Sequence, residues 1–343
     1  MQKDHAAVGG DEWLGQTGRS WAEQWRRTDR SFSVLTERLL RRTREFAFGS
    51  VLDIGCGAGE LSLAIGRGRP HCRVIGVDIS PQLVDGARER GANHPNVSFE
   101  LADAASWQPA EVFAPELLIS RHGVMFFDDP VAAFAHLREI AAPGAGLLFS
   151  CFRGRHENPA FTEVACLLPE PPPPPDDLHA PGPFAFAERR HVEDILQRAG
   201  WTGVGFESFD FAMVVGAGAD PVEDTLAYFA TIGPAARAAR ELDESAREAF
   251  FDRVRNLASR HLREGIVSLR AAAWIVTARA LGVSSAHRLS LDALIRLSPC
   301  AAATNSPPCI RPTTSAGRSS TTSRPTITPW CLRRRSFRTT TRR

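Results

Sequence analysis

The feature that most constrains this 343-residue chain is a glycine-rich stretch, VLDIGCGAGE, at residues 51–60. Four β-prone residues, 51–54, lead directly into glycines at positions 55, 57 and 59, and a helical pattern begins at Glu60. Glycines at this spacing let the backbone turn tightly after a strand and approach a ligand closely. The free amide groups at the start of the following helix favour an anion or a carboxylate. The stretch therefore predicts a strand, a loop and a helix arranged around a ligand.

Strands and helices alternate through the next hundred residues. Short apolar runs suited to strands occupy residues 51–54, 73–78, 97–101, 117–120 and 147–152, and helical patterns lie between several of them. Two of these helices open with a capping residue and a proline, Ser80-Pro81 and Asp129-Pro130. The alternation predicts an α/β fold with a doubly wound, mostly parallel sheet.

The flanking segments complete the expected organisation. Apolar residues recur at helical spacing from residue 18 to 48, so residues 1–48 are expected to form an N-terminal helical cap, frayed over 1–17. We expect the ligand-binding core at residues 49–152. Residues 153–281 are expected to supply a proline-rich insertion, a helical cap and the final strands of the same domain.

Charge is distributed unevenly along the chain. The net charge is +2, yet residues 282–343 hold eleven arginines and a single acid, Asp292. This tail is rich in Ser, Thr, Pro and Arg and has no hydrophobic period from residue 300 onward, which predicts disorder. Three interpretations stay open: a neutral extension, a reading-frame change near residue 281, or an arm that binds nucleic acid or a membrane surface.

Composition also limits the class of protein. No run of 18 or more apolar residues occurs, and residues 1–5 lack the features of a signal peptide. The seven cysteines include no C-x-x-C pair, which predicts reduced thiols and no metal site. We therefore expect a cytoplasmic protein without a membrane span, and the sequence sets no oligomeric state.

Spacing in the glycine loop separates two ligand classes. A dinucleotide fingerprint requires G-x-G-x-x-G, but Glu60 stands three residues after Gly57. The pattern D-x-G-x-G-x-G instead requires an acid two residues before the first glycine, and Asp53 supplies it. With Asp78 and Asp103 near the ends of the second and third strands, the chain resembles the class I S-adenosylmethionine-dependent methyltransferases.

That resemblance implies a Rossmann-like, seven-stranded sheet whose last strand, near residues 271–280, is antiparallel. The stretch SRHGVMFFDDP at residues 120–130 is similar to a branch that includes the ubiquinone/menaquinone-biosynthesis and trans-aconitate methyltransferases. The implied cofactor is S-adenosyl-L-methionine. Its expected contacts are Asp53, Gly55, Cys56, Gly57, Gly59, Asp78, Ile79, Asp103, Ala104 and Ser120.

The chemistry of adenosylmethionine suits these acids. Asp53 and the loop amides fit its zwitterionic amino-acid end, and Asp78 can accept hydrogen bonds from both ribose hydroxyls. Asp103 can accept from the adenine amine, and Trp107 is a candidate to lie beside the adenine. Each acid has a plainer alternative, because an Asp at a strand end is often only a turn former or helix cap.

The acceptor side gives weaker signals. His122 follows the fourth strand, and two roles stay open: a general base that deprotonates the acceptor, or a residue that only lines the pocket. Arg121 either holds a substrate carboxylate or forms a structural ion pair. Trp21, Trp25 and the 153–186 segment are expected to cover the pocket or to pack in the core.

The sequence thus predicts an enzyme that methylates a small molecule on oxygen or carbon, with no metal and no nucleic-acid partner. Three alternatives stay open. One is a nicotinamide-dependent oxidoreductase of Rossmann type, against which Glu60 argues. The second is a nucleic-acid methyltransferase that grips phosphates with the basic tail. The third is a non-catalytic binding protein that retains the fold.

Overall fold

The computed structural model describes residues 10–171 and 176–281. The predicted disordered tail at 282–343 and all but the first residue of the proline run at 171–175 lie outside the described residues, as do the first nine residues. Within the described part, no helix combines the length and the apolar character needed to cross a membrane.

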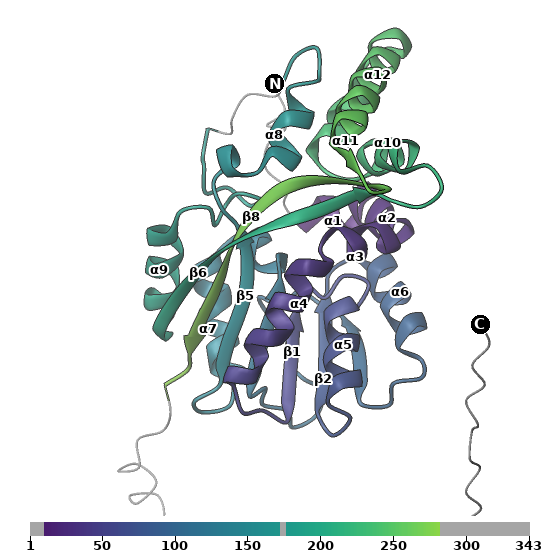
Figure 1. The fold of residues 1–343 in the computed structure, drawn as a ribbon. Coiled ribbons are helices and arrows are strands. Elements are labelled where there is room, and N and C mark those ends of the chain that lie inside the picture. Colours follow the sequence, from purple (N-terminus) through teal and green to yellow (C-terminus); the bar gives the residue numbers. More distant parts are fainter. Residues whose placement is uncertain (1–9, 172–175, 282–343) are drawn as a thin grey trace, which may run out of the picture. The chain divides into compact units, whose positions relative to one another are not determined.

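One mixed sheet forms the centre of the fold (Figure 1). Its strands are β1 (Ser50–Ile54), β2 (Arg73–Asp78), β3 (Val97–Leu101), β4 (Leu117–Arg121), β5 (Gly146–Phe152), β6 (Thr202–Gly216), β7 (Leu262–Arg263) and β8 (Ile266–Arg279). The order across the sheet is β3-β2-β1-β4-β5-β8-β6, with β7 paired to β8 outside this path. Strands β1 to β5 are parallel, and β8 runs antiparallel to both of its neighbours, β5 and β6.

This topology confirms the doubly wound, mostly parallel sheet with an antiparallel last strand. The seven-stranded prediction missed only the two-residue strand β7, which is too short to give a periodic signal. Glu264 and Gly265 connect β7 to β8, and both have positive φ, 48° and 79°. Two such residues make the tight turn that suits the twist of a hairpin.

Helices cover both faces of the sheet. Helices α4 (Ser33–Arg42), α5 (Glu60–Gly68) and α6 (Pro81–Gly91) lie on one face, and α7 (Pro130–Ile140) and α9 (Arg189–Arg198) lie on the other (Figure 1). Because both faces are covered, the central strands are almost continuously apolar, and all seven residues of β5 are buried. The core therefore consists of two layers, one on each side of the sheet.

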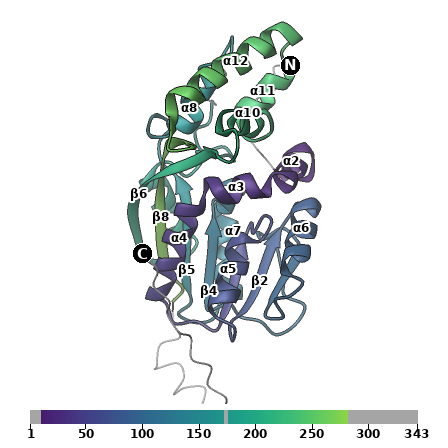
Figure 2. The same ribbon diagram turned by 45° about the vertical axis from the view of Figure 1, so that its right-hand side comes forward.

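The remaining helices gather beyond the carboxyl ends of the parallel strands (Figure 2). The N-terminal group is α1 (Gly10–Leu14), α2 (Gln16–Glu23) and α3 (Trp25–Ser31). The later group is α8 (Pro159–Ala165), α10 (Pro221–Thr231), α11 (Pro234–Glu241) and α12 (Glu244–His261). These two groups supply the predicted helical cap.

The N-terminal segment differs from its prediction in two ways. Residues 10–17 are not frayed, because Trp13 packs edge-to-face on Trp21 at 5.5 Å and on Phe126 at 5.1 Å. The helical pattern after residue 18 is also divided into short helices at Gln24 and Phe32, whose ψ values of 16° and 9° bend the chain between them. The bends let successive short helices follow the rim of the sheet.

Candidate functional site

A cavity lies at the carboxyl ends of β1 to β5, where a doubly wound sheet places its ligands. The space open to water-sized molecules measures about 210 Å³. Of the predicted site residues, those that line it are Asp53, Gly55, Cys56, Gly57, Asp78, Ile79, Asp103, Ala104, Arg121 and His122. The structure therefore brings together most of the residues selected from strand ends.

Gly57 is the point at which the glycine loop is open to a ligand. All three loop glycines have positive φ: 64° at Gly55, 55° at Gly57 and 83° at Gly59. A Cβ at Gly55 would lie 2.8 Å from Gly123 Cα, and one at Gly59 would lie 2.7 Å from the Phe99 ring. A Cβ at Gly57 would meet nothing within 4 Å. Gly55 and Gly59 are thus required by packing, and Gly59 does not line the cavity.

Asp78 ties this loop to the end of β2. Its Oδ2 accepts a hydrogen bond from Gly57 N, and its Oδ1 accepts one from Ser80 N, each at 2.9 Å. Burial raises the pKa of Asp78 above its usual value, while these backbone donors favour the ionised form. Its carboxylate therefore fixes the loop and still faces the cavity.

Asp53 lies beneath the loop, with 1% of its surface exposed. Its Oδ2 accepts a hydrogen bond of 2.6 Å from Ser62 Oγ on α5. Burial raises the pKa of Asp53 to about 7. A cationic ligand nearby would favour the ionised carboxylate, because opposite charges lower a carboxyl pKa.

In the turn after β3, Asp103 faces the cavity and Trp107 does not. Asp103 lines the cavity and accepts a hydrogen bond of 2.9 Å from Ala105 N, and Ala104 is buried beside it. Trp107 is not among the lining residues. Its indole N–H donates to Glu100 Oε2 at 2.7 Å, and its ring packs edge-to-face on Phe113. A carboxylate partner and an apolar neighbour hold the indole away from the cavity lining, and its place beside an adenine stays a prediction.

Ser120 lies behind the glycine loop, and its predicted contact with the cofactor stays a prediction. Its hydroxyl is buried, donates to Ile54 O at 2.7 Å and accepts from Gly123 N at 3.0 Å. These bonds join the ends of β1 and β4 behind the loop. Ser120 does not line the cavity; it stabilises the strand ends that lie behind the glycine loop.

His122 follows β4 with a positive φ of 67°. Its ring stacks on Phe152 with a centroid separation of 4.0 Å, and Nδ1 lies 3.5 Å from Ser150 Oγ. Burial lowers the pKa of His122 to about 3, and the neighbouring charge of Arg121 acts in the same direction. The imidazole is therefore neutral near pH 7 and holds an added proton poorly, which favours pocket lining over general-base chemistry.

Arg121 sits in a cluster of charges at the start of α5. Its guanidinium contacts the Glu60 carboxylate and donates to Thr36 Oγ1 at 2.8 Å. Asp29 Oδ1 lies 3.9 Å from Arg121 Nη2. This geometry favours the structural ion pair over a free receptor for a substrate carboxylate. It also gives Glu60, which occupies the glycine position of a dinucleotide fingerprint, a partner within the fold.

Asp29 is a site residue that the sequence did not reveal. It lines the cavity from α3, and its Oδ2 accepts from Arg90 Nη2 at 2.7 Å. Burial raises the pKa of Asp29, while Arg121 and Arg90 oppose the shift. Asp29 lies inside an ordinary helical pattern, 61 residues from Arg90, so no local motif identified it.

Six aromatic rings form a connected surface of the cavity, which we call the aromatic wall. Its members are Trp13, Trp21, Phe32, Phe126, Phe152 and Phe161. Neighbouring rings are linked at centroid distances from 4.9 Å between Phe152 and Phe161 to 6.4 Å between Trp21 and Phe32.

Two of the predicted covering elements therefore line the cavity: Trp21, and the 153–186 segment through Phe161 and Pro183. Trp25 does not line it. Its ring lies instead beneath the Arg90 guanidinium, 3.8 Å from the centroid.

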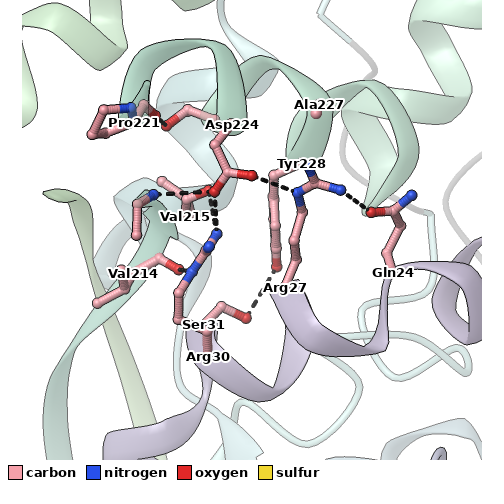
Figure 3. Close-up of polar contacts among 12 residues, drawn as sticks. Gln24, Arg27, Arg30, Ser31, Val214, Val215, Pro221, Asp224, Ala227 and Tyr228 are labelled. Atoms are coloured by element: carbon pink, nitrogen blue, oxygen red, sulfur yellow. Dashed lines mark hydrogen bonds and ion pairs between the residues drawn. The ribbon is translucent and has the colours of Figure 1, made fainter. Parts of the chain in front are cut away.

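Helix α3, which carries Asp29, is fastened to α10 on its other side (Figure 3). Arg27 Nε and Arg30 Nη2 each lie 2.7 Å from a different oxygen of Asp224. Ser31 Oγ and Tyr228 Oη are 3.4 Å apart, and Tyr228 lines the cavity. The N-terminal and later cap helices are thus joined by ion pairs directly beside the site.

Among the described residues, no group of three or more His, Cys, Asp or Glu side chains is placed to hold a metal ion.

Comparison with known proteins agrees with this geometry. A family model described as a methyltransferase domain matches residues 51–144. A trans-aconitate 2-methyltransferase from Paracidovorax citrulli is 32% identical over 133 residues, which cover 38% of this chain and 50% of that protein. Malonyl-[acyl-carrier protein] O-methyltransferase 1 from Ilyobacter polytropus is 28% identical over 121 residues, 35% of this chain and 44% of the relative. The chain thus spans half or less of these curated relatives.

Solved structures resemble the chain more loosely. A putative methyltransferase from Bacillus halodurans is 16% identical with a TM-score of 0.44, covering 71% of this chain and 98% of the other. A phosphoethanolamine N-methyltransferase 2 from Haemonchus contortus is 15% identical with a TM-score of 0.47, covering 79% and 59%.

The doubly wound sheet, the glycine loop and the acidic strand ends define a Rossmann-like methyltransferase domain. Asp53 and the glycines at 55, 57 and 59 form its characteristic loop. Residues 51–144 match the methyltransferase-domain family, and the chain is similar to the class I S-adenosylmethionine-dependent methyltransferases.

Proposed function

We propose that this protein transfers a methyl group from S-adenosylmethionine to an oxygen or carbon atom of a small-molecule acceptor. The observation that carries the proposal is the shared cavity. The open backbone at Gly57 and the carboxylates of Asp78 and Asp103 face the same space as the aromatic wall. One cavity thus offers polar partners for a nucleoside and apolar surface for a second molecule.

The donor groups fit adenosylmethionine. Asp78 suits the ribose diol, since a carboxylate accepts charge-assisted hydrogen bonds from two hydroxyls. Asp103, with Ala104 beside it, suits the adenine amine. Asp53 and Asp29 place negative charge where a cationic ammonium or sulfonium is to be held. An unobstructed Gly57 allows close approach of the ligand to the loop.

The residues of the chain position the reactants and exclude water. Adenosylmethionine supplies a methyl carbon on a cationic sulfur, and the electron pair of the C–S bond returns to sulfur as the acceptor takes the methyl group. His122 and Phe152 form a buried, uncharged surface next to this cavity. Holding the acceptor in line within a dry pocket provides much of the rate for such a displacement.

Calorimetric titration with S-adenosylhomocysteine tests the cofactor assignment. We expect wild-type protein to bind and Asp78→Asn to bind roughly tenfold or more weakly, because one charge-assisted bond contributes about 1.5–3 kcal/mol. Asp85→Asn is the matched control, since this exposed aspartate on α6 does not line the cavity. Binding of NAD in place of S-adenosylhomocysteine would favour the oxidoreductase alternative.

Transfer from methyl-labelled adenosylmethionine to cell extract, followed by identification of the labelled product, tests the reaction itself. Label in a small molecule supports the proposal, whereas label in nucleic acid would favour the second alternative. Absence of transfer by protein that binds the cofactor would contradict the proposed activity. The curated relatives are named for malonyl-[acyl-carrier protein] and trans-aconitate, so both compounds belong in the acceptor panel.

A further inference from the structure

Two rings of the aromatic wall and the cofactor acids come from different parts of the sheet, whereas Trp13, Trp21 and Phe32 come from the N-terminal helical segment. Asp53, Asp78 and Asp103 follow or end β1, β2 and β3, whereas Phe126 and Phe152 follow or end β4 and β5. The order β3-β2-β1-β4-β5 therefore separates the acids from these rings across the cavity. Phe161, from α8, extends the ring surface through its edge-to-face contact with Phe152. The side beyond β4 is thus the place for the methyl acceptor.

The aromatic wall presents rings, and not charged groups, to an acceptor. Phe32, Phe152 and Phe161 form an unbroken series, with centroid separations of 6.2 Å and 4.9 Å. On the opposite flank, Trp13 contacts both Trp21 and Phe126 edge-to-face. Such surfaces favour apolar, planar ligands, because aromatic pairs add to the free energy of apolar burial.

Charge around the cavity disfavours a polyanionic acceptor. Carboxylates outnumber guanidinium groups in the lining: Glu12, Asp29, Asp53, Asp78 and Asp103 stand against Arg121, Arg237 and Arg240. Of the three arginines, Arg121 already contacts Glu60, and Arg237 already contacts Glu12. Within residues 10–171 and 176–281, Arg240 is the lining arginine without an ion pair, and it is exposed. Two of the acids are also paired, Glu12 with Arg237 and Asp29 with Arg90. The lining of this described part thus offers a ligand with several carboxylates a single unpaired cation, Arg240, beside the carboxylates of Asp53, Asp78 and Asp103.

We propose that the methyl acceptor is a largely apolar, ring-containing small molecule with at most one negative charge, seated against the aromatic wall. This inference rests on the proposed methyltransferase function and narrows its substrate class. It sets this chain apart from the relatives named for trans-aconitate, a tricarboxylate that would need several unpaired cations in the cavity.

The full-length protein, saturated with S-adenosylhomocysteine, provides the test. The probe is N-phenyl-1-naphthylamine, an uncharged dye with a phenyl ring and a naphthalene ring system, whose emission rises in apolar surroundings. We expect the dye to bind, and Phe161→Asp to weaken binding about tenfold or more, because the change removes an aromatic contact and adds a buried charge. Phe161→Leu should lose only a few-fold, since it keeps the apolar volume. Trans-aconitate should not displace the dye.

Phe251→Ala is the control variant, since this partly buried ring on α12 is not among the lining residues. It should leave dye affinity unchanged. If Phe161→Asp fails to fold, Phe126→Ala tests the same wall from the other flank, with a similar loss expected. The proposal is overturned if the dye does not bind, if the wall variants bind it as wild type does, or if trans-aconitate displaces it. Calorimetry in the same samples keeps the two hypotheses separate, because failure to bind S-adenosylhomocysteine counts against the methyltransferase function itself.

Discussion

The absence of a Cβ at Gly57 permits both its backbone conformation and the close approach of a ligand. The residue has a φ of 55°, and the position of its missing Cβ is empty to 4 Å. Asp78 holds its amide, so the loop cannot easily move away from an added methyl group. These constraints have separate consequences, one for stability and one for affinity.

The Gly57→Ala substitution should separate the effect on stability from the effect on affinity. Positive φ costs a non-glycine residue about 1 kcal/mol, so we expect the free energy of unfolding to fall by about that amount. S-adenosylhomocysteine affinity should fall at least tenfold, since the new methyl group occupies the ligand's approach. Gly203→Ala is a close match, because Gly203 has a φ of 63° and open space but does not line the cavity. It should lose the same stability and no affinity; equal affinities in the two variants would refute the role of Gly57.

Burial of the His122 imidazole makes the stability of the protein depend on pH. Its pKa falls from 6.5 to about 3 in the folded protein. Between these values the unfolded chain binds a proton that the folded protein does not, so stability falls as pH decreases from 6.5 toward 3. Asn is the suitable replacement, since it tolerates positive φ and has no charge to gain.

We therefore expect His122→Asn to lose less stability on acidification than wild type. The difference should approach about 1.4 kcal/mol per pH unit below pH 6, the value for one differentially bound proton. Urea unfolding at pH 7, 6 and 5 measures it. Parallel pH profiles would show that the folded-state imidazole titrates normally and would revive the general-base interpretation of His122.

At the scale of elements, α3 has partners on two sides. Asp29 faces the cavity and pairs with Arg90 of α6, while Arg27 and Arg30 hold Asp224 of α10 (Figure 3). The side chain of Asp224 is only 15% exposed and also accepts from Ala217 N at 3.1 Å. The position of Asp29 therefore depends on contacts made almost two hundred residues further along the chain.

Asp224→Asn should weaken this attachment. We expect a loss of about 2 kcal/mol in the free energy of unfolding, typical of hydrogen bonds to a charged partner. S-adenosylhomocysteine affinity should fall several-fold, although Asp224 does not line the cavity. Glu37→Gln breaks the exposed Arg41 pair on α4 and should cost less than about 0.5 kcal/mol, with no change in affinity. Unchanged affinity in Asp224→Asn would mean that α3 keeps its position without α10.

Across the whole molecule, what the sequence predicted well was local. The glycine loop, Asp53 and Asp78 lie within or at the end of strands whose patterns are clear, and parallel strands bring such ends to one edge. Trp107 and Ser120 do not line the cavity, because sequence proximity to a motif does not fix the direction of a side chain. The Trp107 indole donates a hydrogen bond to Glu100, and the Ser120 hydroxyl donates one to Ile54 O.

The rest of the site was beyond prediction for a different reason. Asp29 reaches the cavity only through packing between helices that are distant in sequence. Its local pattern is that of an ordinary helix, so nothing in it distinguishes a cavity residue from a core residue. The type of the N-terminal and late helices was predictable, but their arrangement above the sheet was not.

The aromatic wall draws on several elements of the chain, and only Phe126 lies within residues 51–144. The glycine loop, Asp78 and Asp103 all belong to that domain, whereas the other five rings precede or follow it. Substitutions in those five rings therefore leave the glycine loop and its acids unchanged. Under the proposed function, the acceptor surface and the donor surface of the cavity can change independently of one another.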